Sequence, residues 1–123
     1  MDLHQLSFGK IILLSDRLAE VIVDEDVELN SKHISEYHAF LLKHLQAPFC
    51  LLINKINHYS YDSVAQANIA NLDEIDKMAV VSYNRIITTV TQYLQDVFHQ
   101  DWNLKIFSDR DTALNWLKTN CGQ

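Results

Sequence analysis

The chain has 123 residues, of which 48% are apolar and 21% are charged, and its formal net charge is −6. This length and mixture are typical of one soluble globular domain and do not fit a largely disordered chain. Sixteen acidic side chains against ten basic ones disfavour nucleic acids and anionic membrane surfaces as partners, because proteins bind both through Lys and Arg.

The chain carries no predicted targeting or membrane segment. Its first ten residues lack a basic stretch before an apolar one, so we expect no signal peptide. Its apolar runs are far too short for a membrane span. Cys50 and Cys121 are the only cysteines, and two cysteines do not make a disulfide scaffold. We therefore expect a cytoplasmic protein, in which a reducing environment is the default.

The first third of the chain predicts a β-hairpin and then a helix. Residues 8–14 and 19–25 are short, rich in β-branched side chains and separated by a turn, as in a hairpin. Residues 31–46 have apolar side chains at helical spacing, and Asn30 or Ser31 can cap the start of that helix. The expected apolar stripe of the helix is Ile34, Tyr37, Leu41, Leu42 and Leu45.

The middle of the chain predicts two buried strands with a polar loop between them. Residues 49–56 are almost continuously apolar, as in a strand that is buried on both faces. Residues 57–63 form the polar loop, and residues 63–75 have a weaker pattern that indicates a short or irregular helix. Residues 78–82 are a second short apolar strand.

The last third predicts a helix, a strand and a final helix. Residues 85–99 are amphipathic at helical spacing, and residues 104–107 form a short strand. In the SDRD segment that follows, Ser108 and Asp111 fit a capping box at the start of the helix ALNWLKTN. Three side chains of that helix are expected to face the sheet, with Trp116 at the edge of the same face: Ala113, Leu114 and Leu117.

Strands that alternate with helices define an α/β fold. We predict one domain over residues 1–123, with a mixed five-stranded sheet and about four helices. The N-terminal hairpin is antiparallel, the later strands are parallel, and right-handed crossovers place helices on both faces of the sheet.

Three segments from Cys50 onward are distinctive: the strand CLLINKI, the strand KMAVVS at 77–82, and the ending IFSDRDTALNWL at 106–117. In these segments the chain resembles the SpoIIAA-like (STAS/SEC14-type) bacterial proteins. It implies a small α/β domain. Related STAS domains are regulatory modules that bind proteins, some of them switched by serine phosphorylation, and SEC14-type relatives bind lipids.

The serine switch of such modules has only a partial counterpart here. In the related anti-sigma-factor antagonists an Asp-Ser pair is followed by a small residue and a glycine. Asp62 and Ser63 match the pair, but the small residue and the glycine are absent. Ser60 and Ser63 are the candidate phosphorylation sites.

Several kinds of chemistry have no matching pattern in this sequence. Gly9 and Gly122 are the only glycines, so neither a phosphate loop nor a dinucleotide fingerprint can form. The histidines of the first helix are five and six residues apart, which does not suit a metal pair on one helix face. Cys50 lies in an apolar strand, where a buried, inert thiol is expected. We assign no catalytic residue, no cofactor and no metal ligand.

The carboxyl ends of the parallel strands are the expected binding edge, as in other open α/β sheets. Loops 57–63, 83–85 and 108–110 would meet there. The candidate ligand or partner surface is Tyr59, Ser60, Tyr61, Ser63, Tyr83, Asn84 and Arg110.

We therefore expect a regulatory or protein-interaction module without enzymatic activity that binds a protein partner, or a second copy of itself as a two-fold homodimer. One alternative is a carrier or sensor of a small apolar, lipid-like ligand, in a pocket lined by Val64, Ile69, Leu72 and Ile75. The other is a regulator switched by phosphorylation, of the anti-sigma-antagonist type.

Overall fold

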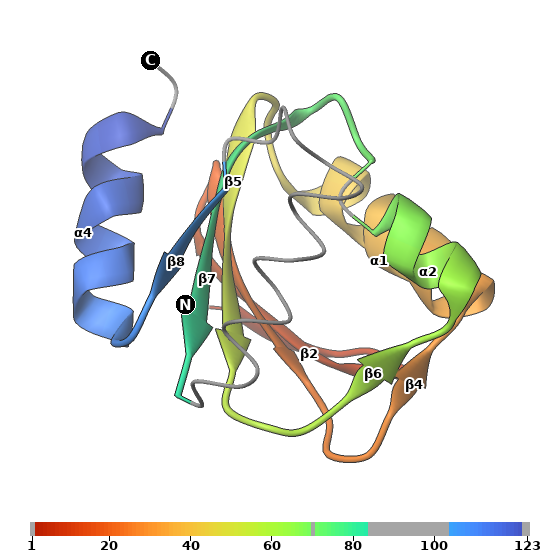
Figure 1. Cartoon of the computed structure of the whole chain (residues 1–123). Coiled ribbons are helices and arrows are strands. Elements are labelled where there is room, and N and C mark those ends of the chain that lie inside the picture. The colour runs from red at the N-terminus through yellow and green to blue at the C-terminus, as the bar shows by residue number, and fades with distance from the viewer. Residues whose placement is uncertain (1, 70, 84–103, 122–123) are drawn as a thin grey trace.

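The computed structural model (Figure 1) describes residues 2–69, 71–83 and 104–121. Within these ranges the main sheet has six strands in the order β1-β2-β3-β5-β7-β8. They are β1 (Asp2–Gln5), β2 (Gly9–Ser15), β3 (Leu18–Val23), β5 (Phe49–Lys55), β7 (Ile75–Ser82) and β8 (Leu104–Phe107). A second, two-stranded sheet pairs β4 (Glu28–Leu29) with β6 (Ser60–Tyr61). The described helices are α1 (Ser31–His44), α2 (Ser63–Asn68) and α4 (Arg110–Asn120).

The strand directions confirm the predicted mixed α/β sheet. β1, β2 and β3 are antiparallel neighbours, whereas β3, β5, β7 and β8 are parallel. At the hairpin Gly9 is required, because a Cβ there would lie 2.8 Å from the Cα of Val23 and even closer to the carbonyl oxygen of Ile22. That close approach lets β2 pair with the end of β3.

The strand count and one helix boundary differ from the sequence prediction. The prediction of five strands was wrong, because residues 2–5 form an exposed edge strand in which Leu3 is the one apolar residue, so there is no alternating pattern. The segment expected to be helical over 63–75 is helical only as far as Asn68, and β7 begins at Ile75. The helix predicted at 85–99 lies outside the described residues.

Two apolar layers sandwich the sheet, one on each face. On one face α1 and α2 pack on side chains from β2, β3, β5 and β7, including Ile11, Val21, Leu51 and Met78. On the other face α4 packs through Ala113 and Leu117. Figure 1 shows α4 on the side of the sheet opposite α1 and α2. Helices therefore cover both faces, as predicted.

The helix starts are fixed by side chains, and one predicted cap was wrong. Asn30 caps α1 by accepting from the backbone N–H groups of Lys32 and His33. At α4 the capping residue is Asp109, whose carboxylate accepts from the N–H of Thr112 at 2.9 Å. The predicted Ser108 cap was wrong by one residue, because two neighbouring residues, Ser108 and Asp109, both suit a cap.

The apolar stripe of α1 is one residue narrower than predicted. Ile34, Tyr37, Leu41 and Leu45 are buried, but Leu42 is 48% exposed. In α4, Leu114 is partly buried at the core, and Trp116 packs on Phe107 with 5.6 Å between the ring centroids. Trp116 thus lies at the edge of the helix face, as predicted.

Candidate functional site

The predicted binding residues lie on opposite faces of the sheet. Tyr59 and Tyr61 pack against the core beneath α1. Arg110 begins α4 on the other face, and Tyr83 directly follows β7, the strand that pairs with β8, so both lie at the carboxyl edge of the parallel strands. Asn84 lies outside the described residues. The single surface predicted from the sequence is therefore two separate groups.

The group on the α4 face is built around a buried carboxylate. Glu20 lies in the middle of β3 and is only 3% exposed. Arg110 donates to it twice: Nη2 lies 2.8 Å from Oε1 and Nε lies 3.0 Å from Oε2. Such a bidentate pair fixes the plane of the guanidinium as well as its position. Arg110 is among the binding residues predicted from the sequence, whereas Glu20 is not.

The second neighbour of this carboxylate is an amide from the adjacent strand. Asn54 of β5 donates from Nδ2 to Glu20 Oε2 at 2.9 Å. Its own Oδ1 atom is buried and accepts no hydrogen bond within the described part of the chain. An unpaired buried acceptor is costly.

The protonation state of Glu20 follows from these contacts. Burial alone would raise the pKa of its carboxyl group. The hydrogen bonds from Arg110 and Asn54, together with the charge of Arg110, outweigh burial and hold the pKa below its ordinary value. The same hydrogen bond from Arg110 to Glu20 raises the pKa of the guanidinium. Both groups are charged at neutral pH, so the pair is an ion pair.

Two side chains bring this group to the surface. The side chain of Arg110 is 37% exposed, and Tyr83, directly after β7, is 54% exposed. The contacts to Glu20 use Nε and Nη2 of the guanidinium. Within the described part of the chain Nη1 donates no hydrogen bond, so among these residues the fixed guanidinium keeps an unused donor, at the same edge of the sheet as the exposed Tyr83.

The group on the α1 face is a cation held between two tyrosines. Lys55 Nζ donates to the hydroxyl of Tyr61 at 2.8 Å and lies 4.7 Å from the ring centroid of Tyr59. The two tyrosine rings meet edge to face at 5.6 Å. Burial, followed by the neighbouring Tyr61, raises the pKa of Tyr59 well above its ordinary value. Cation–π contact and ring packing make this group a stabilising part of the fold.

The candidate phosphorylation sites lie next to this group and are both exposed. Ser60 lies in β6, paired in register with Glu28 of β4. Ser63 is the first residue of α2, directly after the capping residue Asp62. The structure therefore leaves both hydroxyls accessible, and phosphorylation of either one stays a prediction.

The residues predicted to line an apolar pocket are not all on the inside. Val64 is 51% exposed. The other three, Ile69, Leu72 and Ile75, are partly buried and pack against the core beneath α1. Only these three have the placement that the pocket hypothesis needs.

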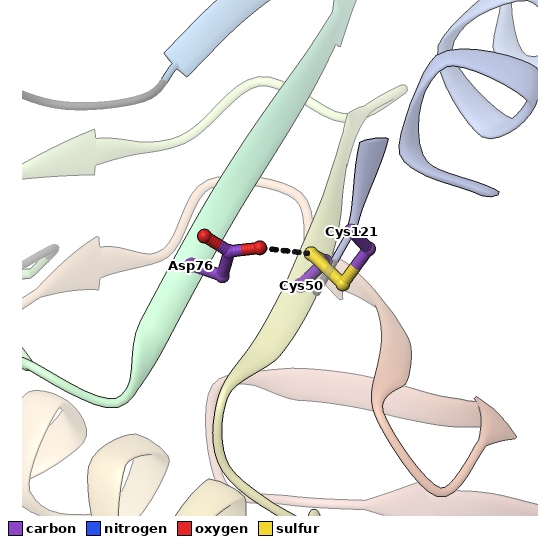
Figure 2. A group of neighbouring side chains, drawn as sticks. All are labelled: Cys50, Asp76 and Cys121. Atoms are coloured by element: carbon purple, nitrogen blue, oxygen red, sulfur yellow. Dashed lines mark hydrogen bonds between the residues drawn. A yellow bond between two sulfur atoms is a disulfide. The ribbon is translucent and has the colours of Figure 1, made fainter. Parts of the chain in front are cut away.

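The two cysteines are bonded to each other, which overturns the expectation of free thiols. Cys50 of β5 and Cys121 at the end of α4 form a disulfide across 71 residues of sequence, with their Cα atoms 6.1 Å apart. Figure 2 shows the bond beside the carboxylate of Asp76. The prediction of a buried Cys50 is confirmed, but its pairing needed the tertiary arrangement of α4 on the sheet.

Glu20 and Asn54 were not predicted from the sequence, although a signal for them was present. Each is a polar residue inside an otherwise apolar strand, in LAEVIV and FCLLINK respectively. A buried polar side chain needs a partner, so these two positions could have been marked as neighbours in adjacent parallel strands.

The fold and this site define an α/β domain with a polar group at the carboxyl edge of its parallel strands. No family model, no curated protein and no solved structure matches the chain. None of the helices in the described ranges has the length and apolar character needed to cross a membrane.

Proposed function

We propose that the domain is a non-enzymatic interaction module that binds a protein partner through the surface made by Tyr83 and Arg110. The observation that carries this proposal is the fixed guanidinium of Arg110, which is held by buried Glu20 and still open to solvent. Arg and Tyr are among the residues that dominate binding energy at protein interfaces.

The surface is suited to binding because it is organised before a partner arrives. A free arginine side chain loses considerable rotamer freedom when it is ordered at an interface. Here the ion pair with Glu20 has already fixed the side chain, so less entropy is lost on binding. The Nη1 edge, which has no acceptor among the described residues, suits a carbonyl or carboxylate oxygen of the partner, and the ring of Tyr83 suits an apolar side chain of the partner.

Affinity capture with matched variants tests this function. The immobilised wild type, the double variant Tyr83→Ala/Arg110→Lys and a control, Lys43→Ala on α1, are exposed to the same cell extract. We expect a partner that the wild type and the control retain and that the double variant loses. Lysine keeps the charge of Arg110 but cannot reproduce the bidentate fork.

Two results would oppose the proposal. One is a partner that binds all three proteins equally, because the surface would then lie elsewhere. The other is catalytic turnover by the purified domain. Native mass spectrometry of the same preparation tests the alternative function, a carrier of a small apolar ligand. A bound apolar molecule would add a mass that disappears on denaturation.

A further inference from the structure

Three potential metal ligands meet at the amino edge of the parallel strands, away from the Arg110 surface. They are the Sγ atoms of Cys50 and Cys121 and a carboxylate oxygen of Asp76, and all three atoms lie within 4.8 Å of one another. Asp76 Oδ2 is 4.0 Å from Cys50 Sγ (Figure 2). Cys50 is fully buried, and Asp76 and Cys121 are partly buried.

An irregularity in the sheet aims the carboxylate at the two sulfurs. Between β5 and β7 the register passes from Phe49–Ile75 to Cys50–Lys77, so Asp76 is an extra residue opposite this step. Such extra residues re-aim a side chain. Without it, a carboxylate would not lie on the same face as Cys50, the face that α4 covers.

The charges around the site suit a divalent cation once the sulfurs are thiolates. Two thiolates and one carboxylate carry three negative charges. One Zn²⁺ reduces this to a single negative charge, and the ammonium group of Lys77, 3.5 Å from Asp76 Oδ1, balances the remainder. Thiolate ligands also select zinc over magnesium or calcium.

We propose that the reduced pair Cys50/Cys121 and Asp76 bind one Zn²⁺ ion, and that disulfide formation abolishes the site. Two equivalents of a small thiol supply two electrons and two protons, break the sulfur–sulfur bond and become a disulfide themselves. Zn²⁺ then binds the two sulfurs as thiolates and releases their two protons. A reducing cytosol favours the metal-binding form.

The distances required are close to those in the structure. In a tetrahedral zinc site the two sulfurs lie about 3.7 Å apart and a sulfur and a carboxylate oxygen about 3.5 Å apart. Asp76 Oδ2 is already 4.0 Å from Cys50 Sγ. Cys121 is the C-cap of α4, where the helix has ended and the side chain can shift. Water can take the fourth position, as in zinc sites with three protein ligands.

Cobalt and zinc titrations of the full chain test the site. The protein is reduced under anaerobic conditions and titrated with Co²⁺, whose thiolate charge-transfer absorption reports sulfur ligation, and Zn²⁺ is then added as a competitor. We expect one equivalent to bind the reduced wild type and none to bind the oxidised wild type. Cys121→Ser should lose the charge-transfer band of its sulfur, and Asp76→Asn should bind about 10-fold or more weakly.

A histidine variant controls for adventitious binding. His58 lies 3.5 Å from Glu25 at the surface, and His58→Ala should leave the titration unchanged. The proposal is overturned if the reduced wild type shows no thiolate-to-cobalt band, or if Asp76→Asn binds as tightly as the wild type. The cobalt titration of the reduced wild type tests the site by itself, so the experiment still decides the question if Cys121→Ser does not fold. It is also independent of the partner surface at the other end of α4.

Discussion

Glu20 determines the geometry of the proposed partner surface, although it is itself buried. Its carboxylate accepts hydrogen bonds from Arg110 and from Asn54. A buried charge is tolerated only when it is paired in this way. The exposed donor at Arg110 therefore depends on a residue that no partner would touch.

The ion pair predicts how stability depends on pH. The pKa of Glu20 is held below the ordinary value of 4.5. The stabilisation is therefore fully present above that value and is lost as the pH falls through the lower, folded pKa. We expect Glu20→Gln to cost about 1–2 kcal/mol at neutral pH, a modest loss because solvent screens the outer side of Arg110.

Urea unfolding of the wild type and Glu20→Gln between pH 7 and pH 3 measures this effect. The difference in free energy of unfolding should be constant near neutral pH and shrink below about pH 4.5. Glu28→Gln, at an exposed carboxylate in β4, is the control and should show no such change. A difference for Glu20→Gln that does not vary with pH would mean that the carboxyl group has the same pKa in the folded and the unfolded chain.

At the scale of elements, α4 connects the two ends of the sheet. Arg110, the first residue of the helix, forms an ion pair with Glu20. Cys121, directly after the helix, forms the disulfide with Cys50. Between them Ala113 and Leu117 pack on the sheet. The helix is thus fixed by an ion pair, a covalent bond and an apolar face.

The start of α4 offers a direct comparison of two capping candidates. Asp109 accepts from Thr112 N–H, and hydrogen bonds from Thr112 lower the pKa of its carboxyl group. We expect Asp109→Ala to lower the melting temperature by a few degrees, because an orphan N–H loses its acceptor. Ser108→Ala should change it little. The measurement is thermal unfolding followed by circular dichroism. If Ser108→Ala lowered the melting temperature more than Asp109→Ala, Ser108 would be the cap instead.

Local patterns in the sequence predicted most elements, and tertiary pairing accounts for what they missed. The strand at 104–107 and a final helix after SDRD were readable because apolar spacing changes there from a strand-like run to a helical one. The edge strand at 2–5 was not readable, because its exposed side chains have no apolar alternation.

The candidate site was only half predictable, for a related reason. Tyr83 and Arg110 follow strands and could be placed at one edge from topology alone. Tyr59 and Tyr61 do not lie at that edge, because β6 pairs with β4 and the two tyrosines pack against the core beneath α1. The contact of Glu20 with Arg110 joins residues 90 positions apart, and no local pattern encodes it.

At the scale of the whole molecule, the disulfide joins the last helix to the central strand β5. Cys50 and Cys121 are separated by 71 residues, so the bond closes a long loop in the unfolded chain. In the chain-entropy model a loop of this length contributes about 4 kcal/mol. The contribution arises in the unfolded state, and it should vanish on reduction without any change in the packing of α4.

Denaturant unfolding of oxidised wild type, reduced wild type and Cys121→Ser, all in the presence of a chelator, measures that contribution. The chelator removes any stabilisation by a bound metal ion. We expect the reduced wild type and Cys121→Ser to be equally stable, and both to lie about 4 kcal/mol below the oxidised wild type. If all three unfolded at the same denaturant concentration, the disulfide would not restrain the unfolded chain. If only Cys121→Ser were destabilised, the cause would be packing around the sulfur rather than the covalent bond.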